Sequence, residues 1–283
     1  MNFWKHASRM LALLLLFAMM LSGCGKDASD SDTETETEHE HQWSEWTVER
    51  EPTCDTEGKK VSTCACGERT VRRVDALGHT YTDGVCKVCG EPKPSEGLEF
   101  MSKGDGTCIW DGMGTCEDAE LIIPAVSPAG DRVTEIYPFV LRGENQRRLT
   151  RVVIPDSVMR IGHEAFRYCS ELLEVQIPDG ITEIQSYTFS GCFKLDHVVL
   201  PQNCTSIDIG AFSVCSGLTE ITLPAGLRSI GNYAFDDCRA LTDIHYGGTM
   251  AQWEAIEKGI DWDRGTDRYT VHCTDGDIVK SES

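Results

Sequence analysis

The residues best suited to chemistry are cysteines and histidines that gather between residues 39 and 92. Cys-x-x-Cys-Gly at 86–90 is a spacing that places two thiolates on one metal ion, and its glycine lets backbone amides approach the sulfurs. A second pair lies upstream in a Cys-x-Cys-Gly sequence at 64–67. We therefore predict a structural zinc site. Its expected ligands are Cys64, Cys66, Cys86 and Cys89, with His79 as a substitute ligand.

Two features keep other readings of this cysteine-rich segment open. The first pair is one residue shorter than the usual Cys-x-x-Cys spacing. A unit of about 50 residues also buries little core, so it needs either a metal or disulfides to fold. Disulfides, and reduced cysteines without metal, therefore remain alternatives to zinc. A catalytic zinc is not expected, because the segment has no His-Glu-x-x-His sequence and no glutamate placed as a base.

The second half of the chain repeats with a period of 23 residues. Five residue types recur in register, which is the signature of a stacked solenoid whose repeats contact only their neighbours. The phenylalanines are Phe166, Phe189, Phe212 and Phe235, the cysteines are Cys169, Cys192, Cys215 and Cys238, and parallel columns of proline, leucine and isoleucine start at Pro155, Leu172 and Ile161. We expect the repeat cysteines to be buried thiols that bond to backbone groups, and not a ladder of metal sites.

One repeat predicts two short strands. Ile221 and Leu223 alternate with the polar Thr222, so the two apolar side chains face the core while the threonine faces outward. Pro224 ends this strand because it lacks the N–H group that a strand ladder requires. A second short strand is expected near 227–230.

The segment 154–172 resembles the BspA-type leucine-rich repeat, a family of bacterial surface proteins that also occurs in some parasitic protists. The resemblance covers roughly residues 118–246. It implies a leucine-rich repeat solenoid rich in short β-strands, with the repeats at 150–246. The family consists mainly of adhesion and recognition modules with varied ligands, so the resemblance implies binding and names no partner.

The ends of a solenoid need caps that cover its exposed core. We expect an N-terminal cap at 97–149 with a hairpin turn at Asp111-Gly112, which would place Cys108 opposite Cys116. These two could form a disulfide or remain free thiols. The C-terminal cap is expected at 247–283, where Thr249 and Gln252 form a capping box at the start of a short helix. Core packing of Trp253 is favoured over ligand binding, and a last strand and turn should follow at 268–276.

Residues 1–23 have the basic start and short apolar run of a signal peptide. The run ends in Leu-Ser-Gly-Cys at 21–24, which resembles the lipobox of bacterial lipoproteins and implies that Cys24 carries the lipid. Residues 24–41 are acidic and rich in serine and threonine, and they predict a disordered tether. The cysteine-rich, ribbon-like unit at 42–92 follows. It resembles small repeats in surface proteins of Gram-positive bacteria. The expected location is therefore the bacterial membrane, lipid-anchored and facing outward.

The composition excludes several functions. A net charge of −20 argues against nucleic acid and anionic lipid as partners. No nucleophile elbow, phosphate loop or zinc-protease motif appears, so an enzyme is not expected. We predict a monomer that binds an extracellular protein or glycan, with a structural envelope component as the alternative. The contact residues would be the outward strand positions Arg151, Val153, Glu174, Gln176, His197, Val199, Glu220, Thr222, Asp243 and His245.

Overall fold

The computed structural model describes residues 40–141, 143–266 and 268–280 of the 283-residue chain. The predicted signal peptide, Cys24 and nearly all of the tether lie outside these residues. The described residues divide into two compact units, one at 40–52 and 57–75 and the other at 53–56 and from 76 onward. The cysteine-rich segment predicted as one unit at 42–92 is therefore split between them. Within the described residues, no helix is long and apolar enough to cross a membrane.

The first unit is a small antiparallel sheet. Its strands pair in the order β1 (Thr47–Arg50), β2 (Gly58–Thr63) and β3 (Arg69–Val74). Val61 and Cys64 are buried, whereas β1 is exposed along its whole length and β3 over most of it. A sheet with so little buried apolar area needs support beyond its own packing.

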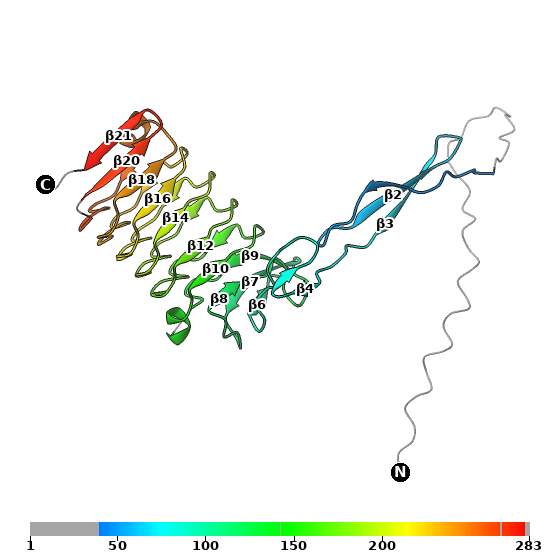
Figure 1. Cartoon of the computed structure of the whole chain (residues 1–283), viewed down its shortest axis with the longest axis horizontal. Coiled ribbons are helices and arrows are strands. Elements are labelled where there is room, and N and C mark those ends of the chain that lie inside the picture. The colour runs from blue at the N-terminus through cyan, green and yellow to red at the C-terminus, as the bar shows by residue number, and fades with distance from the viewer. Residues whose placement is uncertain (1–39, 142, 267, 281–283) are drawn as a thin grey trace, which may run out of the picture. The chain divides into compact units, whose positions relative to one another are not determined.

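The second unit is dominated by a β-solenoid of about seven turns. Each turn supplies one strand to a parallel ladder on one face, and Figure 1 shows these strands side by side from green to red. They are β8 (Glu120–Ile122), β10 (Arg151–Val153), β12 (Glu174–Gln176), β14 (His197–Val199), β16 (Glu220–Leu223), β18 (Asp243–Tyr246) and β20 (Tyr269–Cys273). Hydrogen bonding groups them as β12-β10-β8 and β14-β16-β18-β20, with β21 (Gly276–Lys280) added antiparallel at the end.

Each turn also contributes a short strand to a second parallel ladder, as the sequence of one repeat predicted. Its members are β9 (Arg132–Ile136), β11 (Arg160–Ile161), β13 (Glu183–Ile184), β15 (Ser206–Ile207), β17 (Ser229–Ile230) and β19 (Glu257–Lys258). The register follows the 23-residue period, because Val198 pairs with Ile221 and Ser206 with Ser229. The central residue of each three-residue face strand is buried and its two neighbours are exposed or half-buried. The predicted alternation of core and outward residues is confirmed.

A stack of phenylalanine rings forms the centre of the solenoid. Neighbouring rings in the series Phe166, Phe189, Phe212 and Phe235 lie 5.6, 5.5 and 5.4 Å apart between centroids, and they are nearly parallel. All four side chains have no exposed area. Tryptophans close the stack at both ends, with Trp110 at 6.3 Å from Phe166 and Trp262 at 6.0 Å from Phe235.

The thiols of the repeat cysteines donate hydrogen bonds to backbone carbonyls inside the stack. The thiols of Cys192, Cys215 and Cys238 donate to the carbonyl oxygens of Phe166, Phe189 and Phe212 at 3.3, 3.1 and 3.1 Å. Burial raises the pKa of the Cys215 thiol to about 12, so it remains protonated and can donate. The predicted structural role of these thiols is confirmed.

The N-terminal cap differs from its prediction. β7 (Thr107–Gly112) runs straight through Asp111-Gly112, and its hairpin with β6 (Glu99–Ser102) turns at 103–106 instead, where Gly104 and Gly106 both have positive φ. The expected turn was wrong because the segment around Trp110 forms a strand whose tryptophan is buried in the core. The structure shows Cys108 and Cys116 as buried free thiols.

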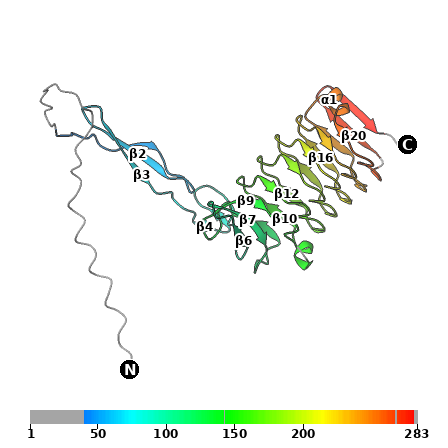
Figure 2. The same cartoon turned by 180° about the vertical axis from the view of Figure 1, so that it is seen from behind.

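The C-terminal cap follows its prediction more closely. Thr249 and Gln252 form the reciprocal capping box of α1 (Met250–Glu254), which lies beside the last strands in Figure 2. Trp253 is buried and packs at 5.5 Å from the ring of Tyr246, which confirms its core role. The sequence did not reveal β21, which covers the edge of β20 and so protects the end of the ladder.

Replacing one ring of the stack should be costly. We expect Phe189→Ala to lower the free energy of unfolding by about 3–5 kcal/mol, because it leaves a cavity between two stacked neighbours. Phe193→Ala is the matched control, since Phe193 is 44% exposed and should change stability little. Urea unfolding of both variants makes the comparison. Equal stability of the two would contradict the stacking account.

The thiol ladder should be chemically silent in the native state. We expect maleimide at pH 8 to leave Cys215 unmodified in the folded protein and to modify it once urea unfolds the chain, because its burial holds the pKa at about 12. Peptide mapping by mass spectrometry measures the difference, and the exposed thiols of Cys66 and Cys89, after removal of metal with a chelator, serve as internal controls. Rapid native labelling of Cys215 would show that this part of the stack opens.

Candidate metal centre and exposed strand face

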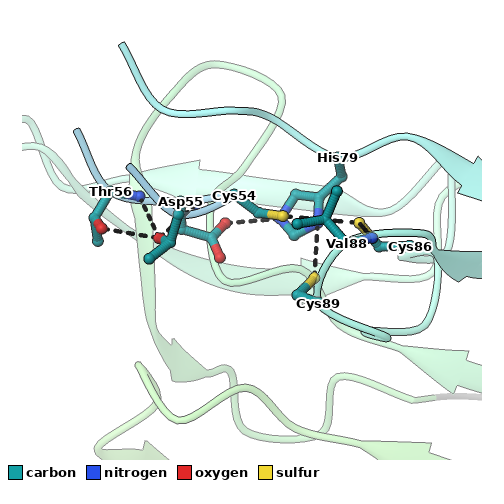
Figure 3. A network of polar contacts seen from close by, with 8 residues as sticks. Cys54, Asp55, Thr56, His79, Cys86, Val88 and Cys89 are labelled. Atoms are coloured by element: carbon teal, nitrogen blue, oxygen red, sulfur yellow. Dashed lines mark hydrogen bonds and ion pairs between the residues drawn. The ribbon is translucent and has the colours of Figure 1, made fainter. Parts of the chain in front are cut away.

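Four potential metal ligands converge in the second unit, and we call them the four-donor cluster. Their ligand atoms all lie within 4.8 Å of one another. The members are Cys54, His79, Cys86 and Cys89. The sulfurs of Cys54 and Cys86 are 3.8 Å apart, and the Cys89 sulfur is 3.5 Å from Nδ1 of His79. Figure 3 shows the three sulfurs surrounding the imidazole.

A tight hairpin positions two members of the four-donor cluster. β4 (Tyr81–Thr82) and β5 (Val85–Cys86) are joined by Asp83 and Gly84, which both have positive φ. This is the backbone that a two-residue hairpin turn requires. Beyond β5, the Gly90 N–H donates to the carbonyl of Cys86 at 2.9 Å, so the chain curls and returns Cys89 beside Cys86.

The remaining cysteine comes from the loop Thr53–Thr56. The Leu77 N–H donates to the Thr53 carbonyl at 2.8 Å and the Gly78 N–H donates to the Cys54 carbonyl at 3.0 Å. These two bonds hold Cys54 beside the segment that carries His79. The loop also brings Asp55 Oδ1 to 2.7 Å from Nε2 of His79, so the carboxylate fixes the ring with Nδ1 toward the sulfurs.

Hydrogen bonds and burial shift the pKa values of the side chains in this cluster. Backbone N–H groups of Cys89 and Val88 lower the pKa of the Cys86 thiol to about 5, so it is a thiolate at neutral pH. Asp55 raises the pKa of His79 to about 9. Burial raises the pKa of the Cys54 thiol to about 12.

The first unit holds a related group, which we call the three-donor cluster. It consists of His41, Cys64 and Cys66. Nδ1 of His41 is 3.4 Å from the Cys64 sulfur and 3.5 Å from the Cys66 sulfur, while its Nε2 is 3.3 Å from a carboxylate oxygen of Glu68. Each cluster thus has an imidazole whose Nδ1 faces sulfur and whose Nε2 faces a carboxylate.

The structure does not bring the four predicted zinc ligands together. It places Cys64 and Cys66 in the three-donor cluster and Cys86 and Cys89 in the four-donor cluster. This grouping differs from the predicted set of ligands, because Cys54, from the loop at 53–56, and His79 lie with the second pair. The short Cys-x-Cys spacing was the sequence signal that the two pairs differ. Nothing in the spacing revealed that Cys54 folds onto residues 77–78.

The predicted contact residues do share one surface, which we call the strand face. It consists of the outward positions of β10, β12, β14, β16 and β18: Arg151, Val153, Glu174, Gln176, His197, Val199, Glu220, Thr222, Asp243 and His245. Each is exposed or half-buried. Arg151 lies 3.4 Å from Glu174, and His245 lies 3.6 Å from Glu220, so cross-strand pairs neutralise part of the charge.

The sequence missed one histidine at the end of the strand face. His272 on β20 stacks on His245 at 5.0 Å between ring centroids. Its Nε2 lies 2.8 Å from Asp243 and its Nδ1 lies 3.1 Å from Asp277, and these two carboxylates raise its pKa. The same contact with His272 lowers the pKa of Asp243. His272 was missed because it lies outside the regular repeats.

Two shallow hollows adjoin each other at the loop edge of the solenoid, near η1 (Gly143–Arg147). They measure about 480 and 560 Å³ and share Gly143, Gln146 and Tyr168. Tyr168 is 49% exposed, and the guanidinium of Arg167 lies 4.7 Å above its ring. Among the described residues that line the hollows, no converging set of polar groups identifies a ligand.

Comparison with known proteins shows which family the repeats resemble. A family model described as "BspA type Leucine rich repeat region" matches residues 137–255 in six copies. Among curated proteins, none matches the chain. A leucine rich cell surface protein from Faecalibacterium prausnitzii is similar over 62% of this chain, with 27% identity and a TM-score of 0.52. The match spans only 43% of that protein.

Two further solved structures are similar to the repeats. The T. pallidum leucine-rich repeat protein has 29% identity and a TM-score of 0.49, over 54% of this chain and 70% of its own. The pneumococcal vaccine antigen PcpA has 20% identity and a TM-score of 0.40, over 55% of this chain and 37% of its own.

The His272–Asp243 contact should depend on pH in a defined window. The raised pKa of His272 means that its contribution to stability is present below about pH 6.5 and is lost as pH rises through the folded value. The lowered pKa of Asp243 means that its contribution is present above about pH 3.9 and is lost as pH falls. The contact should therefore be strongest between these limits.

NMR titration of the imidazole signals tests this window. We expect His272 in the unchanged protein to titrate above about pH 6.5, and Asp243→Asn to lower that midpoint. Asp196→Asn is the matched control, because Asp196 lies near His197 instead. An unchanged His272 midpoint in the Asp243 variant would show that the contact does not form in solution.

Proposed function

We propose that this chain is a surface recognition module that binds a protein partner through the strand face, because residues 137–255 match the family model of BspA type leucine rich repeats. The similar protein from Faecalibacterium prausnitzii is described as a cell surface protein, which supports an extracellular site of action. The strand face is open, which suits binding to a large partner more than catalysis on a small substrate.

The observation that carries the proposal is the contrast between core and surface along the repeats. Phenylalanine, cysteine and the other stacking positions recur unchanged every 23 residues, because each turn must match the next. The strand face changes from turn to turn at the same register. Glu174, His197 and Glu220 occupy one column, for example, and Gln176, Val199 and Thr222 occupy the other. Stacking does not dictate these side chains, so they are free to serve recognition.

The chemistry of the strand face favours a protein over a glycan. Glycans are usually held by aromatic rings, yet none of the ten strand-face residues is phenylalanine, tyrosine or tryptophan. Val199 is 56% exposed at the centre of the surface, and charged and polar residues surround it. An apolar centre with a polar rim is typical of protein–protein interfaces.

The membrane anchor is a separate proposal that rests on the sequence alone. The Leu-Ser-Gly-Cys sequence at 21–24 supports lipid attachment at Cys24 on the outer side of the membrane. We expect Cys24→Ala either to release the protein from the membrane fraction of its bacterial host or to leave it there as a larger, unprocessed precursor. Immunoblotting of fractionated cells tests this, with Cys273→Ala as the control. A Cys24 variant with both unchanged fractionation and unchanged apparent mass would contradict lipid anchoring.

A binding screen with matched variants tests the strand face. The probes are purified matrix proteins and mucins, each presented intact and after enzymatic removal of its glycans. We expect saturable binding by the unchanged protein, and a loss of about tenfold in affinity for Val199→Asp and for Glu174→Arg. Glu183→Arg is the control, because Glu183 lies on β13 outside the strand face and carries the same charge.

The outcomes separate the alternatives. Binding that survives removal of glycans and weakens only in the strand-face variants supports the proposal. Binding that disappears with the glycans points to a lectin. Equal loss in the Glu183 control would assign the effect to charge in general, and the absence of binding to any probe would favour a structural role in the envelope.

A further inference from the structure

The distances in the four-donor cluster match a tetrahedral metal site. Zinc binds cysteine sulfur at about 2.3 Å and histidine nitrogen at about 2.0–2.1 Å, so tetrahedral ligands should have sulfurs about 3.8 Å apart and sulfur and nitrogen about 3.6 Å apart. The Cys54 and Cys86 sulfurs are 3.8 Å apart, and the Cys89 sulfur and His79 Nδ1 are 3.5 Å apart. These two separations match two edges of a coordination tetrahedron, and all four ligand atoms lie within 4.8 Å of one another.

The surroundings of the cluster also fit a metal. Nε2 of His79 lies 2.7 Å from Asp55, and a carboxylate on the far nitrogen of a metal-binding histidine is a common supporting contact. The Val88 N–H points at the Cys86 sulfur at 3.5 Å, as backbone amides do toward metal-bound thiolates. Figure 3 shows both contacts around the cluster.

We propose that the four-donor cluster binds one zinc ion. Three sulfur ligands and one nitrogen ligand in tetrahedral arrangement are a common structural zinc set, whereas magnesium and calcium require oxygen ligands. Four protein ligands leave no position for a substrate, so the ion is structural. The ion joins the loop Thr53–Thr56 to the segment at 79–89, a region that has only short strands and little apolar core of its own.

The three-donor cluster provides an internal comparison. It repeats the arrangement of imidazole Nδ1 toward sulfur, at 3.4 and 3.5 Å, and Nε2 toward a carboxylate. An aromatic ring stacks on the histidine in both places, Trp43 on His41 and Tyr81 on His79. The strand pairing is also alike, because Trp43 pairs antiparallel with Cys64 and Tyr81 pairs antiparallel with Cys86. The proposal is confined to the four-donor cluster, where all four ligands are present.

Metal analysis of the full chain tests the proposal. The background variant carries Cys64→Ser and Cys66→Ser, which removes the three-donor cluster. After purification under reducing conditions with added zinc and removal of loose metal, we expect this variant to retain one zinc ion per chain. Adding Cys89→Ser should remove that ion, while adding Cys273→Ser instead should leave it, because Cys273 lies outside both clusters.

X-ray absorption spectroscopy on the background variant gives a test that does not depend on a further mutant folding. We expect a zinc shell of three sulfurs at about 2.3 Å and one nitrogen at about 2.0–2.1 Å. We also expect Asp55→Asn in the same background to weaken zinc binding about 10–100-fold in competition with a chelator, because it releases the His79 ring. Glu91→Gln is the control for that measurement.

Three results would overturn the proposal. The first is a background variant that retains no zinc or that prefers another metal. The second is an absorption spectrum that shows fewer than three sulfur ligands. The third is a disulfide between two of the cluster cysteines in the purified, folded protein, found by peptide mapping without reduction.

Discussion

The structure depends on the match between one turn of the solenoid and the next. A phenylalanine ring lies on the phenylalanine ring of the next turn, at 5.4–5.6 Å through the four repeats. The strand ladders pair neighbouring turns in the same 23-residue register, and the thiols of the repeat cysteines donate to the carbonyls of the phenylalanines in the preceding turns. Each contact requires the same residue type at the same place in every turn. A single turn has no partner for these groups, so the turns are stable only as a stack.

This constraint also explains where function can reside. Inward positions are committed to stacking, and the positive-φ positions of the loops are committed to turning the chain. The outward positions of β10 to β18 are not constrained in this way. Their side chains form one surface of mixed charge, with Val199 exposed at its centre. The four-donor cluster is held together by different interactions. It has few apolar contacts, and its geometry comes from hydrogen bonds between Thr53–Thr56 and residues 77–78 together with the hairpin of β4 and β5.

The sequence was informative wherever the period held. The 23-residue columns predicted the solenoid, both strands of each turn, the burial of Phe189 and Cys215, and the outward position of Glu174. The capping box at Thr249 was also readable, because it is a local pattern. Interactions between segments far apart in the sequence could not be predicted in this way. The pairing of Cys54 with Cys86 and the position of His272 beside Asp243 depend on how loops outside the period fold back. The turn expected at Asp111-Gly112 shows the same limit, since burial of Trp110 outweighed a local turn signal.

The most direct test of the account removes one whole turn. Deletion of residues 190–212 joins Phe189 to Ser213 and preserves every column of the 23-residue period. Urea unfolding followed by circular dichroism should show a folded, cooperative and less stable protein. Deletion of residues 190–211 is one residue shorter and shifts every later column, so this variant should fail to form the stack beyond the junction. Equal behaviour of the two deletions, folded or unfolded, would contradict the claim that register between identical turns holds the protein together.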